Sequence, residues 1–210
     1  MQPEDYGIWI IAILGTIFFY YRAYKKRKSV DKVWQSLAQQ LNYKFYPREN
    51  SDKFPRIEGT HKNRFFAIEG FTVPAVMGGG RGTVSYTRIT YPDITKSTPK
   101  TEIHRKYVVN KFITSDLTDS FAYSLNDMEF EKNYIVKVRE SKNISQIIDQ
   151  NIREKLIKLK REFFVNGGII KIGENKIVYE HLSIITDKSY ILSVIDLLSE
   201  IADNCEKITT

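Results

Sequence analysis

The chain has 210 residues, a formal net charge of +7 and a single cysteine. This length suits one well-packed domain, and a lone cysteine excludes an internal disulfide framework and favours a reducing compartment. The first 28 residues, with five basic and two acidic side chains, contribute +3 of this charge, and residues 29–210 carry the remaining +4. No basic stripe interleaved with aromatic residues follows, so we expect no nucleic-acid binding.

An uncharged run from Tyr6 to Tyr21 opens the chain. Continued as a helix through Tyr24, it would reach about 28 Å, close to the thickness of the membrane hydrocarbon. Acidic residues precede the run and basic residues follow it, which is the reverse of a secretion signal. The run therefore predicts a single transmembrane helix, with aromatic and basic side chains at the membrane interface: Trp9, Tyr20, Tyr21, Arg22, Tyr24, Lys25, Lys26, Arg27 and Lys28.

The basic side of this predicted span should face the cell interior, which places the N-terminus outside and the rest of the chain in the cytoplasm. Residues 1–28 are then the membrane anchor with its basic collar, and residues 29–210 form one cytoplasmic domain. A buried core helix is the alternative. Ala12, Gly15 and Thr16 share one side of the span, where a second helix could pack closely, unless they merely reflect ordinary span composition.

The first half of the predicted domain starts with an amphipathic helix at about 29–42, with Trp34 in the core. Residues 43–47 alternate in polarity and predict a strand. A hairpin is expected within 56–71, turning at "HKN", because asparagine tolerates left-handed backbone. Two more strands, rich in β-branched and aromatic residues, are expected at 83–91 and 106–114, joined by an exposed, proline-containing loop.

The second half returns to helical spacing after Asn143, with an apolar stripe that extends to Phe163. The segment "GGIIKIGENKIVYE" predicts a second hairpin that turns at Gly173–Asn175. Thr186 or Asp187 can cap the last helix, whose buried stripe is Ile191, Val194, Ile195, Leu198, Ile201, Ala202 and Cys205. This order predicts an α+β fold: a mainly antiparallel sheet covered by helices, behind the single transmembrane helix.

Five segments, "WQSLAQQLNYKF", "FPRIEGTHKNRFFAI", "YTRITYP", "FITSDLTDSFAYSL" and "VIDLLSEIAD", resemble in this order the blocks of an uncharacterised bacterial family. That family reads as an "L-x-G-x-(6)-R" hairpin, a "Y-T-x-I" strand, a "T-G-D-x-x-F-D-x-x-F" segment and an "L-D-L-L-x-x-L-A" helix. This chain departs from the third block, with Ser115 in place of the glycine and Thr118 and Asp119 where the family shows "F-D". The resemblance implies the α+β fold and the cytoplasmic placement for residues 30–204, and it implies no activity.

Two segments are candidates for ligand binding. The "GGGRG" stretch at 78–82 could hold an anion through Gly79, Gly80 and Arg81, although a strand follows it and no phosphate-loop lysine does, so a plain connection is the alternative. Asp116, in "SDLTDS", could join this site or could simply stabilise a turn.

The spacing of the three histidines, with one cysteine, matches no metal site, so we expect no metal and no cofactor. Cys205 lies in an apolar stripe and is expected to be an inert buried thiol.

A further candidate surface is the helix "NIREKLIKLKREFF", whose basic side chains could meet membrane lipid or an acidic partner, or could form a solvated face: Arg153, Lys155, Lys158, Lys160 and Arg161.

Two hypotheses of function follow. The first is a membrane-tethered cytoplasmic interaction or assembly module, an accessory subunit of a membrane complex that binds a protein partner and membrane lipid. It follows from the predicted anchor and from the lack of a catalytic motif. The alternative is a membrane-surface enzyme or binder of a phosphorylated or lipid ligand that uses the Gly78–Gly82 loop, because catalytic residues can converge without leaving a motif.

Overall fold

The structure is a computed structural model that describes residues 3–50, 53–77, 80–94, 99–106, 117, 119–159, 168–173 and 175–208. Within these ranges the side chains of residues 3–12, 19–20, 22–28, 75–77 and 80–81 lie outside the description. Five helices and nine strands are described, and the strands form one sheet.

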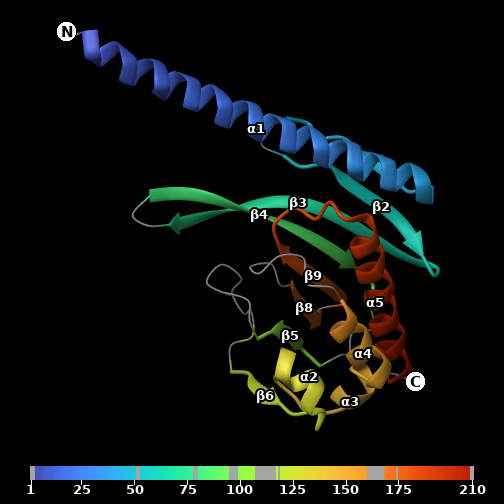
Figure 1. Cartoon of the computed structure of the whole chain (residues 1–210). Helices are drawn as coiled ribbons and strands as arrows, with labels where there is room; N and C mark the ends of the chain where they lie inside the picture. The colour runs from blue at the N-terminus through green and yellow to red at the C-terminus, as the bar shows by residue number, and fades with distance from the viewer. Residues whose placement is uncertain are drawn as a thin grey trace.

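Helix α1 (Pro3–Leu41) is one continuous helix whose first part projects away from the sheet (Figure 1). The prediction of a transmembrane helix is wrong, because no helix in the described part of the chain is long and apolar enough to cross a membrane. The uncharged run has 16 residues, fewer than the about 20 that a span needs, and α1 continues past it into charged sequence. The predicted single-pass localisation, with an outside N-terminus and a cytoplasmic domain, is wrong with it.

The residues assigned to that span are mostly outside the described side chains. Of the predicted interface residues, only the side chain of Tyr21 is described, and it is 63% exposed. Ala12 falls outside the described side chains, Thr16 is exposed, and a Cβ at Gly15 would meet no atom within 4 Å. No described segment therefore packs against the small-residue side of α1 at Gly15.

The sheet has the order β1-β2-β3-β4-β9-β8-β5-β7-β6, and all neighbouring strands are antiparallel. The bounds of the strands are β1 Lys44–Tyr46, β2 Arg56–His61, β3 Arg64–Met77, β4 Gly80–Tyr91, β5 Thr101–Arg105, β6 Phe121–Tyr123, β7 Tyr134–Val138, β8 Gly168–Gly173 and β9 Lys176–Leu182.

Both predicted hairpins are confirmed. β2 and β3 turn at Lys62 and Asn63, which have φ angles of 49° and 63°, as a two-residue turn with left-handed backbone requires. β8 and β9 pair from Gly168↔His181 to Gly173↔Lys176. The predicted strands at 43–47 and 83–91 correspond to β1 and β4.

The region between β4 and β7 was predicted poorly. Part of the expected exposed loop is β5, whose first four residues are buried between β7 and β8. The strand expected at 106–114 lies outside the described residues beyond Lys106. Helix α2 (Met128–Asn133), β6 and β7 were not anticipated.

The helices after β7 follow the predicted spacing with one break. α3 (Ile144–Ile147) and α4 (Gln150–Lys158) replace the single helix, because Asp149 accepts a hydrogen bond from the backbone N–H of Ile152 and starts a new helix. Asp187 caps α5 (Lys188–Lys207) through the N–H groups of Ser189 and Tyr190. Every residue of the predicted α5 stripe is buried.

One core fills the side of the sheet on which the helices pack. The buried apolar residues of all five described helices belong to it, together with inward-facing strand residues such as Ile89, Ile103 and Ile177. The opposite side of the sheet carries a smaller cluster made of strand residues alone: Tyr86, Ile169 and Leu182, with Phe71 and Val84 beside them. We call this opposite side the outer face.

Two buried hydrogen bonds anchor helices to this core. The Trp34 indole N–H donates to the carbonyl of Ile185 at 2.8 Å, which joins α1 to the segment that leads into α5. The Tyr91 hydroxyl donates to the carbonyl of Ile195 at 3.1 Å, which joins β4 to α5. Side chains distant in sequence thus fix α1, β4 and α5 relative to one another.

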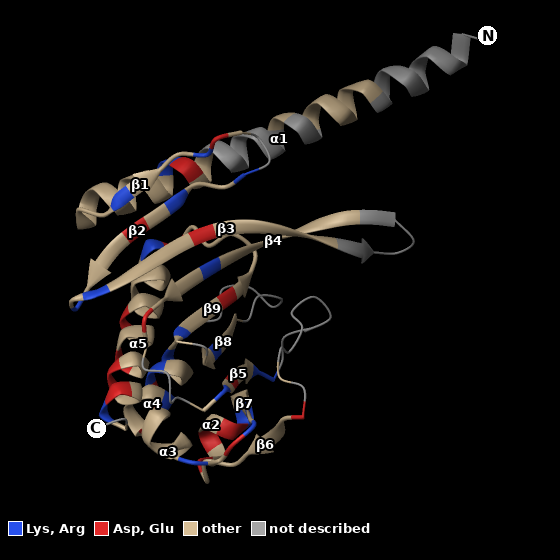
Figure 2. Ribbon diagram, turned by 180° about the vertical axis from the view of Figure 1, so that it is seen from behind, with Lys and Arg blue, Asp and Glu red and all other residues tan. Residues whose placement is uncertain are grey.

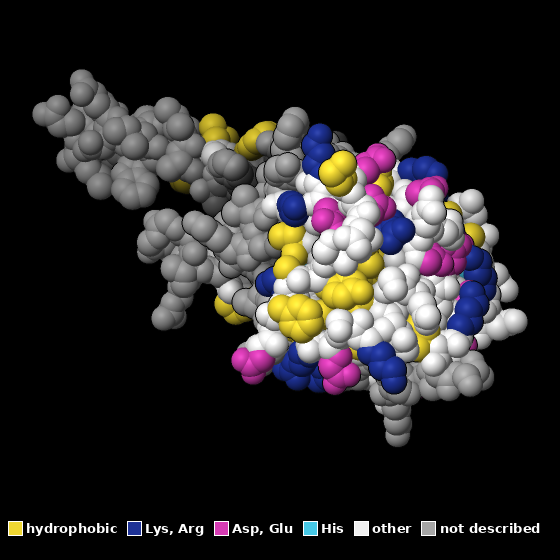
Figure 3. Space-filling view, turned by 90° about the horizontal axis from the view of Figure 1, so that it is seen from below, with side chains coloured by type: hydrophobic (Ala, Val, Ile, Leu, Met, Phe, Trp, Pro, Cys, Tyr) yellow, Lys and Arg dark blue, Asp and Glu magenta, His cyan; other side chains and the backbone are white. Residues whose placement is uncertain are grey.

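The end of the molecule at which α2, α3 and β6 lie shows hydrophobic side chains surrounded by charged ones (Figure 3). Phe121 of β6 and Met128 of α2 are 48% and 89% exposed. Apolar surface at this end is therefore exposed to solvent.

Candidate functional site

A row of side chains with alternating charge crosses the outer face of the sheet. We call it the charge ladder, and its members come from five adjacent strands: Glu69 (β3), Arg88 (β4), Glu180 (β9), Lys171 (β8) and Glu102 (β5). The first acidic and basic bands are visible on β3, β4 and β9 (Figure 2). The sheet register sets this alternation, because Glu69 lies opposite Arg88, Arg88 opposite Glu180, and Glu102 opposite Lys171.

Ion pairs run along the ladder. Arg88 lies 3.3 Å from Glu69 and 2.7 Å from Glu180, and Lys171 reaches diagonally to Glu180 at 3.0 Å. Burial alone would lower the pKa of Arg88, but hydrogen bonds to Glu180 and Glu69 and their charges raise it above its ordinary value. The Arg88 guanidinium also lies over the ring of Phe71, 4.2 Å from its centroid. The ladder is therefore a fixed charge pattern.

A cavity of about 440 Å³ opens on the ladder. We call it the ladder pocket, and its size falls in the range of small-molecule sites. All five ladder residues line it, together with Thr90, Lys100, Thr101, Leu117, Ile172, Gly173, Lys176 and Val178. Rigid strands hold most of this wall, so the pocket is formed before any ligand arrives.

Two titratable residues are buried beside this pocket. Glu102 and His104 are 2% and 5% exposed, and a hydrogen bond of 2.7 Å joins His104 Nε2 to Glu102 Oε2. If Glu102 is ionised, its carboxylate can only accept, and the imidazole N–H is then the donor. Removing a carboxylate from water is costly unless it is paired, and such groups next to a cavity are typical of functional sites.

The turn between β8 and β9 forms one rim of the pocket. Gly173 has a φ of 142°, and a Cβ there would approach Lys100 Cγ to 3.1 Å. Glycine thus lets Lys100 lie against the turn that leads to Lys176. Both lysines, which come from separate segments, line the pocket.

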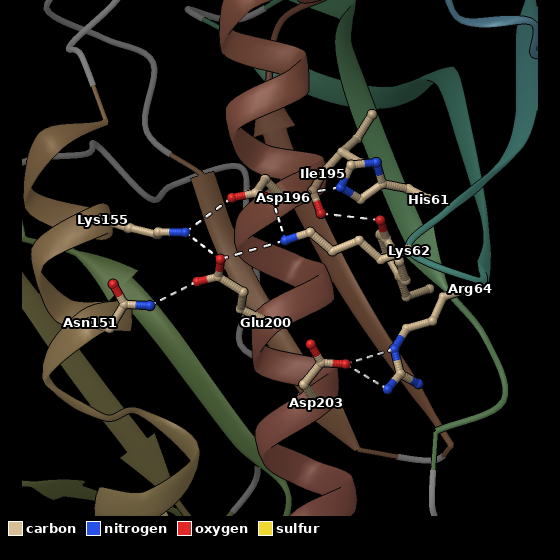
Figure 4. A network of polar contacts seen from close by, with 10 residues as sticks. His61, Lys62, Arg64, Asn151, Lys155, Ile195, Asp196, Glu200 and Asp203 are labelled. Carbon is tan, nitrogen blue, oxygen red and sulfur yellow. Dashed lines mark hydrogen bonds and ion pairs between the residues drawn. The ribbon is translucent and has the colours of Figure 1, made fainter.

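A second polar network lies on the opposite, helix-bearing side, and we call it the α5 clamp (Figure 4). The turn between β2 and β3 and helix α4 both reach acidic residues of α5. Arg64 donates to Asp203 at 2.7 Å and to Glu206 at 2.7 Å, and Lys62 pairs with Asp196 at 2.5 Å. From α4, Lys155 pairs with Asp196 at 3.0 Å and also with Glu200, and Asn151 donates to Glu200.

The clamp predicts a pH dependence of stability. Partial burial would raise the pKa of Asp196, but hydrogen bonds and charges of Lys62 and Lys155 lower it well below its ordinary value. Its contribution is therefore complete above about pH 4 and declines as the pH falls below that value. We expect Asp196→Asn to lower the free energy of unfolding by about 1 kcal/mol at pH 7, because the pairs are partly exposed.

The check is urea unfolding of Asp196→Asn and the wild type at pH 7 and pH 3. The difference in the free energy of unfolding between the two proteins should be smaller at pH 3 than at pH 7. A difference that stays constant over this range would show that the Asp196 carboxylate does not act through the clamp.

The structure does not unite the ligand-binding residues predicted from sequence. Gly79 and Asp116 lie outside the described residues. Gly80 and Arg81 pair with Met77 and Val76 in the β3–β4 ribbon, beyond the sheet neighbours of both strands, and the Arg81 side chain is outside the description. Neither is among the described residues that line the ladder pocket.

The basic face predicted around α4 is largely paired within the protein. Arg153 contacts Asp127 at 3.0 Å, Lys155 belongs to the α5 clamp, and Lys158 lies 3.7 Å from Glu154. Lys160 and Arg161 lie outside the described residues. The described part of this face is therefore not a set of free cations.

Two of the three histidines and the cysteine are buried. Among the described residues no group of three potential ligands could hold a metal ion. His104 and His181 are buried within strands rather than at loops, which the sequence did not predict. Cys205 is fully buried, and burial raises the pKa of its thiol to about 12, so the prediction of a buried thiol is confirmed.

The sequence did not predict the ladder, because a single sequence does not give strand order. Arg88 shares a hairpin with Glu69, but the other three members lie 33 to 111 residues after Glu69. The available signal was the charged residue inside each apolar strand, as in "TRITY", "IIKIG" and "IVYEH". Such a residue must lie on one face of its strand.

Comparison of the chain with protein-family models, curated proteins and solved structures gives no match.

Proposed function

We propose that this protein is a binding module that holds a small polar ligand in the ladder pocket. The observation that carries the proposal is a 440 Å³ cavity walled by seven charged side chains, with the carboxylate of Glu102 almost completely buried. Burying a carboxylate on a sheet face costs free energy unless it is paired. In a ligand site, a few such fixed polar groups give orientation and specificity.

This proposal retains the ligand binding of the alternative hypothesis rather than the interaction module that the sequence favoured, and it uses a different site. The proposed ligand site is the ladder pocket at the centre of the sheet, not the glycine stretch at 78–82. In the sheet, main-chain pairing fixes the position of each side chain. Arg88 and Lys171 are already oriented by Glu180, so a ligand meets charges that need little rearrangement.

The test is a thermal-shift screen of a metabolite library that includes anionic, cationic and neutral compounds. A ligand at about 100 times its Kd should stabilise the protein by about 2.7 kcal/mol, or several degrees in Tm for a chain of this size. Thr90→Tyr should abolish the shift, because Thr90 lines the pocket and a tyrosine ring would fill it.

The matched control is Thr83→Tyr, an exposed position on the same strand that is not among the pocket residues. It should retain the shift. If no compound stabilises the protein, or if hits stabilise Thr90→Tyr as strongly as the wild type, the proposal is wrong.

A further inference from the structure

We infer that the ladder pocket selects an anionic ligand, one that carries a phosphate or carboxylate group, with Lys176 as a direct contact. The inference rests on the proposed function and adds the chemical class of the ligand. Its first basis is the charge of the wall, which has four basic residues, Arg88, Lys100, Lys171 and Lys176, against three acidic ones.

The second basis is that the acidic residues of the wall already have cationic or donor partners. Glu180 contacts both Arg88 and Lys171, Glu69 contacts Arg88, and Glu102 accepts from His104. A cationic ligand would have to compete with these fixed contacts. An anionic ligand meets two carboxylates, those of Glu69 and Glu180, that are already paired with basic side chains.

The third basis is the rim formed by the β8–β9 turn. Lys176 is exposed, and no described residue forms an ion pair or hydrogen bond with its ammonium group. Lys100 approaches the same rim at Gly173, and Thr90 adds a hydroxyl group to the wall. Ammonium and hydroxyl donors around one opening are the groups that bind phosphate and carboxylate oxygens.

The geometry also favours a compact ligand over an extended one. A volume of about 440 Å³ suits a molecule of the size of a sugar phosphate or a nucleotide. The anionic group would lie at the Lys100 and Lys176 rim. The rest of the ligand would lie over Val178 and Thr90, toward the buried pair of Glu102 and His104.

The test uses inorganic pyrophosphate as the anionic probe, with spermidine and trehalose as cationic and neutral probes. Ionic strength is matched with sodium chloride, because salt alone screens surface charges. Calorimetry should detect pyrophosphate binding to the wild type. Lys176→Glu should weaken it about tenfold or more, as expected for loss of a charge-assisted hydrogen bond.

The control is Lys142→Glu, which makes the same charge change in an exposed turn that does not line the pocket. It should leave the affinity within about twofold, since a remote exposed charge is screened at moderate salt. Equal weakening by the two variants, or pyrophosphate binding that Lys176→Glu leaves intact, would overturn the inference.

Failure of the anionic class is distinguishable from failure of the pocket itself. Binding of spermidine or trehalose that Thr90→Tyr abolishes, without pyrophosphate binding, would keep the pocket and reject the anion. If Thr90→Tyr leaves the affinity of every bound probe unchanged, both the anionic class of ligand and the pocket itself are rejected as proposed.

Discussion

Replacement of Trp34 by alanine should lower the free energy of unfolding by about 3–5 kcal/mol, the largest loss that we expect from a single truncation. Trp34 is fully buried, and its indole N–H donates to the carbonyl of Ile185. The change removes a large apolar side chain and leaves a buried carbonyl without its donor. Urea unfolding measures it, with a Tm decrease of about 6–20 °C as a second readout.

Two further variants separate the causes. Trp34→Phe keeps most of the apolar volume and loses the donor, so it should cost about 1–3 kcal/mol. Gln35→Ala, at an exposed position of the same helix, should stay within about 0.5 kcal/mol of the wild type. If Trp34→Ala costs no more than Gln35→Ala, helix α1 does not pack on the domain as described.

Gly168→Ala should be the most damaging of the small changes, at about 1–3 kcal/mol. A Cβ at Gly168 would overlap Cε2, Cζ and the hydroxyl of Tyr179. That ring cannot move aside, because it is buried and its hydroxyl lies 2.7 Å from the hydroxyl of Tyr190. The start of β8 would have to shift instead, and urea unfolding measures the loss.

A double-mutant cycle tests this cause. Tyr179→Leu removes the obstructing ring, so Gly168→Ala should cost much less in that background than in the wild type. Gly15→Ala is the matched control: a Cβ there meets nothing within 4 Å, and alanine in a helix interior should add about 0.5–1 kcal/mol. Equal costs of Gly168→Ala in the two backgrounds would contradict the overlap with Tyr179.

Local sequence patterns predicted the elements that local chemistry specifies. The apolar spacing of α5 and its Asp187 cap, and the left-handed turn at Lys62 and Asn63, each follow from neighbouring residues. β5 was missed because the prolines around it suggested a loop, yet its burial comes from β7 and β8, which lie far along the chain. The membrane span was predicted because extending the 16-residue uncharged run through Tyr24 brought it close to the membrane thickness. That extension includes charged sequence, and no helix in the described part of the chain is long and apolar enough to cross a membrane.

The candidate site depended almost entirely on long-range pairing. Glu69 and Arg88 belong to one hairpin, but Glu180 and Glu102 reach the ladder only through the order β4-β9-β8-β5. The sequence shows that these residues are charged, but it does not show that they lie in one row across the sheet. The glycine stretch was predicted to bind a ligand because its sequence signal is local, whereas a pocket built across strands leaves no motif.

The most direct test of the ladder pocket is a two-dimensional amide NMR titration of the full chain with pyrophosphate. The account predicts that the largest shift changes fall on pocket residues such as Thr90, Gly173, Lys176 and Val178, and that Lys176→Glu suppresses them. Changes confined to the β3–β4 ribbon around Gly80, or to helix α4, would contradict it.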